Sequence, residues 1–374
     1  MPQVIKKKKI VLASVLKPVD DPRMFDKLAC SFCDLDACEV LVMGYPGETN
    51  QTNSCIKVIP SHPFKRISVS RLLQPWRMLL GIIRLKPTHL IVGTHELLLI
   101  GTLSKILIGS KLIYDTRENY YLNILRLSAF PKYLRLPIAH YVRLTEIVLS
   151  PLVDLYILSD GCYQHQLNFL GNKFIIAENK LLRKYGSTKG RRLNDSRGIS
   201  LLFSGTLSES TGVFTAIKLT QDLHKVDSKI QLTIIGYCAK VETLRKIKDA
   251  IQNTDFIQLI GGDQHVPHSS IMNHMQSADF GIIAYPPNPA THDKLPTKLF
   301  EYLGTHLPII LTPNPLLESY CSRYDAAVKI NPDSLNVEEL FSEIKSKAFY
   351  SNLPGDEILW EPEADRLIKA LNTI

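Results

Sequence analysis

The chain has 374 residues, which is too long for one ordinary domain and fits two domains of about 150 to 200 residues. Its composition, 45% hydrophobic and 21% charged, is typical of a folded soluble protein and argues against a disordered chain. The net charge of +8 favours anionic partners, namely nucleotide phosphates, acidic lipid or nucleic acid.

Two kinds of segment are not expected. No run of about 20 apolar residues is free of charge, so the sequence predicts no membrane-spanning helix. The lysines at 6–9 precede an apolar run that stops at Lys17 without a cleavage site, so the sequence predicts no signal peptide.

The seven cysteines include one Cys-x-x-Cys, Cys30 and Cys33, without a second pair at metal spacing. We therefore expect buried apolar thiols in a reducing cytosol and no metal.

The first half of the chain alternates short apolar runs with helical patterns, which is typical of a parallel sheet covered by helices. The predicted strands are Ile10–Val15, Glu39–Met43, Cys55–Ile59, His89–Val92, Lys111–Tyr114, Leu155–Leu158 and Phe174–Ile176. The predicted helices cover about 24–34, 69–84, 97–107, 122–150 and 160–170.

A basic, turn-rich segment at 180–197 then marks a linker, and a second series of the same kind follows. Its predicted strands are Ile199–Phe203, Gln231–Ile235, Ile257–Ile260, Phe280–Ala284, Ile309–Leu311 and Ala327–Ile330. We predict an α/β protein of two Rossmann-like domains with parallel sheets that face a cleft. The predicted boundaries are 1–178 and 179–356, and a helix at about 357–374, opened by Trp360, completes the chain.

The most informative segment is 291–310, which reads as a loop, a helix and a buried strand. Pro296 suits the first helical position, and Gly304 ends the helix. A helix that starts after an exposed loop points free N–H groups at any ligand there, and a phosphate fits. Asp293 and Glu301 lie eight positions apart beside this helix start, so the ligand would carry hydroxyls as well as phosphates, as a nucleotide sugar does.

This segment resembles the donor-site motif of retaining GT-B glycosyltransferases of family 4, in which an acid and a Glu are separated by seven residues. This chain has Asp293 where the family usually has Glu. The resemblance implies that Glu301 binds the ribose hydroxyls and that Asp293 lies near the donor sugar, both with a catalytic role. It also implies that the helix at about 357–374 packs back on the first domain. A solvated helix face for Glu301 and a plain loop position for Asp293 are the alternatives.

The loop Ser204–Gly212 matches the family's phosphate loop, although an ordinary strand-to-helix turn is the alternative reading. Thr206 and Thr211 stand where the family usually has Arg and Lys, so two cations for the diphosphate are absent. Lys294 and Lys298 are the candidate replacements, together with backbone N–H groups and hydroxyls. The resemblance assigns the following to donor binding: Gly205, Thr206, Ser208, Thr211, Gly212, Gly236, Tyr237, Lys294, Pro296, Thr297, Lys298 and Glu301. The loops at 236–237 and 266–268 would flank the base.

Polar clusters follow three predicted strands of the first domain, where α/β ligands bind. His95 matches the family's catalytic His and could hydrogen-bond a sugar or move a proton, although a structural His is the alternative. The remaining acceptor-side candidates are Asp20, Asp21, Arg23, Asp115, Arg117 and Glu118. For them the alternatives are a structural ion pair and a capped helix start; Arg23 and Arg117 would otherwise bind anions.

The stretches 66–86 and 122–146 combine basic residues with Leu, Ile and aromatic side chains, a pattern that suits an anionic membrane surface. Helices with one core-facing stripe and a solvated basic face are the alternative. The residues concerned are Arg66, Arg71, Arg77, Arg84, Lys86, Arg126, Lys132, Arg135 and Arg143, with Trp76, Tyr121 and Tyr133. No helix-turn-helix, zinc-finger or RNA-platform signature supports nucleic-acid binding.

Taken with the resemblance, the sequence predicts a retaining, hexosyl-type glycosyltransferase that takes a sugar from a UDP- or GDP-linked donor. The acceptor would be a glycan or lipid-linked saccharide of cell-surface polysaccharide biosynthesis. We expect a cytoplasmic protein, peripheral on the inner face of the membrane, without a metal or other cofactor. The alternatives are a non-catalytic nucleotide-sugar-binding relative and a sugar-nucleotide epimerase on the same fold.

Overall fold

The computed structural model describes residues 8–35, 38–47, 53–64, 68–126, 130–187, 198–289 and 291–374. The chain divides into two compact units, which are described separately. Unit 1 comprises Met1–Asn179 and Trp360–Ile374, and unit 2 comprises Lys180–Leu359. Arg66 and residues 188–197 of the predicted linker lie outside the described residues.

Unit 1 contains, among its described residues, a seven-stranded parallel sheet in the order β3-β2-β1-β4-β5-β6-β7. The strands are β1 (Lys8–Pro18), β2 (Cys38–Tyr45), β3 (Ile56–Pro60), β4 (His89–Val92), β5 (Lys111–Thr116), β6 (Leu155–Leu158) and β7 (Phe174–Ile176). Central strands such as β4 are buried along their whole length, as expected for a sheet with helices on both faces.

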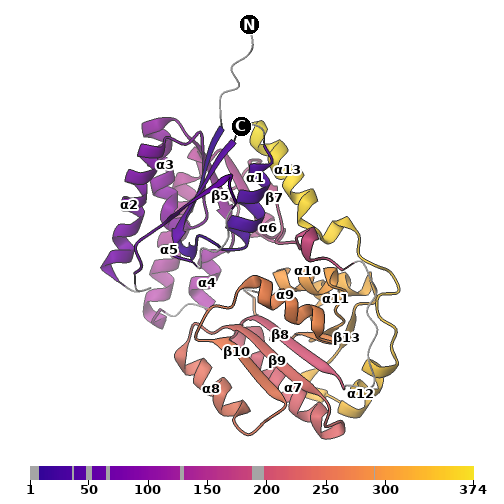
Figure 1. The fold of residues 1–374 in the computed structure, drawn as a ribbon. Coiled ribbons are helices and arrows are strands. Elements are labelled where there is room, and N and C mark those ends of the chain that lie inside the picture. Colours follow the sequence, from indigo (N-terminus) through magenta and orange to yellow (C-terminus); the bar gives the residue numbers. More distant parts are fainter. Residues whose placement is uncertain are drawn as a thin grey trace. The chain divides into compact units, whose positions relative to one another are not determined.

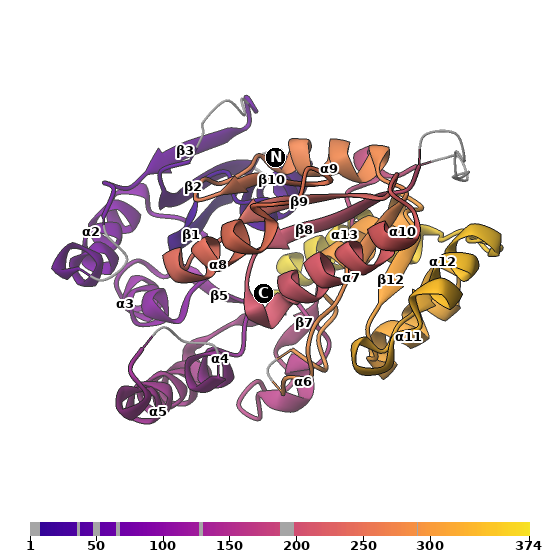
Figure 2. The ribbon, with the colours of Figure 1, turned by 90° about the horizontal axis from the view of Figure 1, so that it is seen from below.

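The helices of unit 1 cover the two faces of this sheet (Figures 1 and 2). The chain moves from β1 to β2 in one direction and from β4 to β5 and β6 in the other, so right-handed connections place the helices on opposite faces. One face carries α2 (Val69–Leu85), α3 (Leu98–Ile108) and α5 (Lys132–Leu149); the other carries η1 (Arg23–Ala29), α1 (Cys30–Cys33) and α13 (Trp360–Asn372). Shorter pieces are η2 (His95–Leu97), α4 (Tyr120–Arg126), η3 (Ser150–Leu152) and α6 (Tyr163–Gln166).

Unit 2 holds a six-stranded parallel sheet among its described residues, in the order β10-β9-β8-β11-β12-β13. Its strands are β8 (Ser200–Thr206), β9 (Gln231–Tyr237), β10 (Ile257–Gly262), β11 (Phe280–Ile283), β12 (Ile309–Leu311) and β13 (Ala327–Lys329). Its helices are η4 (Arg183–Tyr185), η5 (Glu209–Thr211), α7 (Val213–Val226), α8 (Val241–Ile251), α9 (His268–Ser277), α10 (Thr297–Gly304), α11 (Pro315–Ser322), η6 (Pro332–Ser334), α12 (Val337–Ser346) and η7 (Asp356–Ile358).

The predicted α/β class with two parallel sheets is confirmed, and each predicted strand is present, whereas three predicted helices differ. The helix expected at 160–170 shrinks to α6, because Asp160 Oδ1 accepts a hydrogen bond from Cys162 N and Leu167 leaves helical geometry. The helix expected at 24–34 begins as the π-helix η1, with Lys27 N bonded to Pro22 O at 3.0 Å. The single helix expected at 122–150 is split into α4 and α5.

Helix α13 packs on unit 1 beside α1 and η1, although it follows unit 2 in the chain (Figure 1). Trp360 anchors it: the ring is 1% exposed, and Nε1 donates to Ser31 Oγ at 3.0 Å. The charged ends of Arg23 and Lys27 lie 5.9 Å from the Trp360 ring centroid, within cation–π range.

The expectation of buried thiols holds for Cys238 and Cys321 but is wrong for the other five cysteines, which are half-buried. Several of these lie at element ends, where packing is incomplete. Burial and the Cys55 thiol raise the pKa of Cys33 well above its usual value. Within the described residues, none of the helices has both the length and the apolar character to span a membrane.

A buried carboxyl on α5 makes the stability of unit 1 depend on pH. Glu146 is 1% exposed, accepts from Tyr114 Oη at 3.0 Å and lies 3.6 Å from Arg143. Burial raises the pKa of Glu146 from 4.5 to about 7, although Arg143 and Tyr114 oppose the shift. The protonated form is therefore favoured in the folded state, and its stabilisation, complete below pH 4.5, is lost as the pH rises through 7.

Glu146→Gln is expected to stabilise the protein at pH 8, by up to about 3 kcal/mol, because the amide carries no buried charge. At pH 5, where Glu146 is mostly protonated, the gain should be much smaller. Thermal unfolding of both proteins at the two pH values measures this difference, with Glu338→Gln as an exposed control. Equal shifts at pH 5 and pH 8 would contradict the assignment.

Candidate active site

Both sheets reverse their strand order at one point, between β1 and β4 in unit 1 and between β8 and β11 in unit 2. In open parallel sheets, ligands bind beyond the carboxyl ends of the strands at such a point. The residues that follow β1, β4 and β5 in unit 1, and β8 and β9 in unit 2, therefore belong to the two candidate sites. The sequence-predicted site residues lie at these edges or around the start of α10.

The conformation of the loop after β8 is held by hydrogen bonds from its own hydroxyl groups to its own backbone. Thr211 Oγ1 donates to Thr206 O at 2.8 Å and accepts from Ser208 N at 3.1 Å, which completes a capping box. Thr206 itself is exposed. The Thr211 hydroxyl thus shapes the loop, and the two threonines supply no positive charge in place of the family's cations.

Glycines let the strands and the loop approach one another closely. Gly236 has φ +150°, and a Cβ there would lie 1.7 Å from Gly205 O. Gly212 has φ +81°, and a Cβ there would lie 1.8 Å from Ala284 O. Neither position accepts a side chain, so glycine is needed for the close approach of these backbone segments.

Lys298 in the first turn of α10 is buried, 7% exposed, rather than solvated. Its Nζ lies 4.4 Å from the Phe203 ring centroid and 5.4 Å from that of Tyr285. The Cε atom would lie 3.8 Å from a Cβ on Gly205, so the side chain lies against the end of β8. Among the described residues, Nζ has no hydrogen-bond partner.

This environment disfavours the charge on Lys298. Burial lowers its pKa from 10.5 to about 8, and the nearby carboxylate of Glu301 partly opposes the shift. A buried amine without a hydrogen-bonding partner destabilises the fold. It is, however, ready to receive an anion.

Glu301 is also buried, at 6% exposure, which excludes the solvated helix face. Its Oε1 lies 2.7 Å from His268 Nε2 at the start of α9. The His268 ring packs edge-on against Tyr185, with centroids 5.4 Å apart, and its Nδ1 is buried without a partner in the described part of the chain. A carboxylate, an imidazole and an amine thus line one edge of the unit 2 sheet.

The rest of the predicted donor segment lies nearer the surface. Asp293 is exposed and bonds His292 Nδ1 at 2.8 Å, and Lys294 is half-buried in the same loop.

Helix α10 begins at Thr297, and Pro296 is its N-cap. The prediction of Pro296 at the first helical position is therefore wrong by one residue, because the backbone of Pro296 is extended, with ψ 143°. Tyr237 stacks on His265, with centroids 4.0 Å apart.

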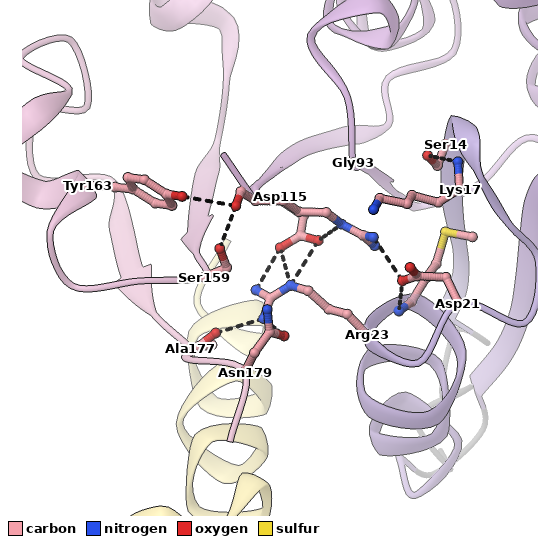
Figure 3. Close-up of polar contacts among 12 residues, drawn as sticks. Ser14, Lys17, Asp21, Arg23, Gly93, Asp115, Ser159, Tyr163, Ala177 and Asn179 are labelled. Atoms are coloured by element: carbon pink, nitrogen blue, oxygen red, sulfur yellow. Dashed lines mark hydrogen bonds and ion pairs between the residues drawn. The ribbon is translucent and has the colours of Figure 1, made fainter. Parts of the chain in front are cut away.

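In unit 1, two arginines and two aspartates from the acceptor-side group form a buried ionic network (Figure 3). Arg23 Nε and Nη2 donate to Asp115 Oδ1, at 3.0 and 2.7 Å, and Nη1 donates to Ala177 O at 2.9 Å. Arg117 bridges Asp115 and Asp21 at 2.8 Å each. Burial alone would raise the pKa of Asp115, but both arginines outweigh it and hold that pKa below its usual value.

The network favours the structural ion-pair reading of these residues, because each guanidinium is committed to carboxylates. Asp20 lies against the backbone of Gly47, and Glu118 accepts from Asn123 Nδ2 at 2.7 Å. No group of three or more His, Cys, Asp or Glu within the described ranges is arranged to hold a metal.

Several polar atoms on η2 and on the helices α2 and α4, or next to η2, are buried and lack hydrogen-bond partners within the described residues. These atoms are Gln74 Oε1, Thr94 Oγ1, His95 Nδ1, Glu96 Oε2 and Asn123 Oδ1. Arg71 of α2 pairs with Glu96, and the rings of Tyr120 and His95 lie 4.6 Å apart, so α2, η2 and α4 meet here. Burial lowers the pKa of His95 below its usual value, with Glu96 opposing, so the ring is neutral at pH 7.

The sequence analysis singled out His95, Lys298 and Glu301 as candidates but not several of the residues that surround them in the structure. It placed His268 in a base-flanking loop, not beside Glu301, and it did not single out Tyr185, Tyr285, His265, Gln74 or Asn123. A polar residue such as Gln74 on the otherwise apolar, core-facing side of a helix is a signal that could have been followed.

Comparison with solved structures shows the GT-B fold. Sucrose-phosphate synthase from Thermosynechococcus elongatus superposes with a TM-score of 0.70 at 11% identity, over 98% of each chain. Anabaena HepE in complex with UDP and glucose gives 0.64 at 13% identity, over 99% of this chain and 100% of that one. A Listeria monocytogenes protein, provisionally named UDP-N-acetylglucosamine 2-epimerase, gives 0.60 at 12% identity, over 98% and 96%. No family model and no curated protein matches the sequence.

Proposed function

We propose that the chain is a glycosyltransferase that takes its sugar from a nucleotide-diphosphate donor. The observation that carries the proposal is the buried, unpartnered amine of Lys298 beside Gly205 and near Glu301. A diphosphate would give Lys298 its missing partner, and a ribose diol would suit the Glu301 carboxylate. HepE, of the same fold, was solved with UDP and with UDP-glucose.

Lys298 takes over, in this proposal, the role of the absent loop cations at 206 and 211. Backbone N–H groups at the first turn of α10 add a positive partial charge. The ribose bonds Glu301 while His268 holds that carboxylate in place, and Tyr237 with His265 lies beside the base. As the sugar–phosphate bond breaks, Lys298 stabilises the charge that develops on the leaving diphosphate.

The acceptor is assigned to unit 1, at the group of unpartnered polar atoms around His95. A neutral imidazole offers one donor and one acceptor, which suits a sugar hydroxyl. We further propose a retaining, hexosyl-type transfer to a glycan or lipid-linked saccharide in cell-surface polysaccharide synthesis. The protein would be cytoplasmic and peripheral to the membrane. We expect donor binding without a metal ion, with Lys298 and backbone N–H groups offsetting part of the charge of the diphosphate.

A sugar-nucleotide epimerase is the second candidate, favoured by the fold shared with the Listeria protein. Incubation with donor alone separates the two activities. An epimerised sugar would support the second candidate and overturn the first.

The proposed function predicts heat protection by the correct nucleotide. A panel of UDP- and GDP-sugars, with UDP and GDP alone, is expected to include ligands that raise the melting temperature, since a ligand that binds only the folded state stabilises it by mass action. Calorimetric titration then gives the affinity. If no member of the panel shifts the melting temperature or gives a binding isotherm, the chain is not a nucleotide-sugar enzyme.

A further inference from the structure

Exposed apolar side chains concentrate on three neighbouring helices of unit 1. Of nineteen large apolar side chains that are exposed among the described residues, five lie on α2, three on α3 and seven on α5. Helix α3 contacts both α2 and α5, and the three helices cover the same face of the sheet (Figures 1 and 2). Their outer faces, called here the α2–α3–α5 surface, thus hold fifteen of these nineteen side chains, and such a concentration marks an interaction site.

Helix α2 illustrates how this surface arises. Its inner face, with Met78 and Ile82, packs on the core of unit 1. Its outer face carries a second apolar stripe at helical spacing that includes Leu72, Trp76 and Leu80, at 73%, 50% and 60% exposure. A helix that only covered a core would be polar on that outer side, so the second stripe requires another partner.

The charges on the same helices have one sign. Among the described residues of α2, α3 and α5 the basic side chains are Arg71, Arg77, Arg84, Lys105, Lys132, Arg135 and Arg143. Glu146 is the single acid among them, and it is 1% exposed. Arg77, Arg84 and Lys132 are exposed and have no ion-pair partner within the described part of the chain. The surface is thus apolar and cationic at once.

We propose that the α2–α3–α5 surface binds an anionic membrane. Leu72, Trp76 and their neighbours would enter the boundary between headgroups and acyl chains, and Arg77, Arg84 and Lys132 would contact lipid phosphates. A symmetric contact with a second copy would bring these cations together without an exposed carboxylate to pair them. The proposal does not depend on the donor site, so either can fail without the other.

A tryptophan supplies the readout. The chain has two, and Trp360 is buried on α13, so a change of emission on adding vesicles reports Trp76. With the full-length protein and vesicles of phosphatidylcholine containing about 30% phosphatidylglycerol, we expect co-sedimentation and a blue shift. With phosphatidylcholine alone, binding should be at least tenfold weaker.

Two variants separate the charge from the apolar contact. Arg77→Gln with Arg84→Gln is expected to weaken binding to anionic vesicles about 30-fold, since each basic residue near such a surface accounts for about fivefold. Leu72→Ser with Leu80→Ser should abolish the blue shift of Trp76. The control is Val241→Ser on α8 of unit 2, which removes an even more exposed apolar side chain and should bind as wild type does.

Three results would overturn the proposal. The first is an unchanged Trp76 emission and no co-sedimentation with anionic vesicles. The second is equal loss of binding in the Val241 control and in the Leu72 and Leu80 variant. The third is sedimentation equilibrium that shows a dimer abolished by the Leu72 and Leu80 changes, together with no vesicle binding. UDP titration of the Arg77 and Arg84 variant, expected at wild-type affinity, shows that its donor site is intact.

Discussion

Glu301→Ala is expected to lower sugar transfer by roughly two to four orders of magnitude. Each hydrogen bond between a carboxylate and a ligand hydroxyl contributes about 1.5–3 kcal/mol, and a ribose diol makes two. The substitution also removes the carboxylate from His268, which lies 2.7 Å away and positions it. Release of nucleoside diphosphate from the donor that the heat-protection panel selects, in the presence of acceptor, measures the loss.

A buried acid also contributes to the fold, so stability must be separated from function. Glu301→Gln keeps one oxygen that can accept from His268 and keeps the volume of the side chain, and circular dichroism with thermal melting shows whether each variant is folded. We expect Glu301→Gln to be folded and still impaired by more than tenfold in turnover. Purified, folded Glu301→Ala with near wild-type turnover would refute the assignment of this residue.

Lys298→Met is expected to weaken UDP binding about 30- to 5,000-fold, because removal of one partner of a buried charge pair costs roughly 2–5 kcal/mol. The apo protein should melt at the same temperature or higher, since methionine removes a buried amine that lacks a hydrogen-bonding partner. Loss of affinity without loss of stability identifies a ligand-binding role, which a merely structural lysine would not give. Lys218→Met on α7 is the exposed control.

The pH dependence of UDP binding gives an independent check on Lys298. Its pKa of about 8 means that the free protein carries the charge below pH 8 and loses it above. An anionic ligand raises that pKa, so wild-type affinity should be highest below pH 8 and fall by up to about tenfold per pH unit above it. The Lys298→Met variant should show a flat profile from pH 7 to pH 9, and an equally flat wild-type profile would contradict the role.

The arginines of the buried ionic network in unit 1 differ from Lys298 in whether they are available to a ligand. Arg23 and Arg117 looked like anion-binding groups in the sequence, yet each is bonded to carboxylates in the interior. In the sequence, Lys298 was one of two candidates, with Lys294, to replace the absent loop cations. In the described structure the Lys298 amine lacks a hydrogen-bond partner. Whether a cation is available to a ligand depends on what packs around it, which residue type and spacing do not reveal.

The sequence by itself determined the two parallel sheets and the edges at which the candidate site residues lie. Few folds other than a parallel sheet covered by helices are compatible with an alternation of short apolar runs and helical patterns. Residues that directly follow a parallel strand must then lie at the carboxyl end of that strand. It also identified Glu301 and Lys298 on one short helix, α10.

Only the tertiary structure decided how these side chains are paired and buried. Helical spacing tells which positions share a face, not what covers that face. His268 approaches Glu301 from 33 positions away, and Phe203 and Tyr285 enclose Lys298 from β8 and the segment after β11. Burial and charge pairing arise from contacts between segments distant in the chain, and they determine the pKa of Lys298 and its readiness to receive an anion.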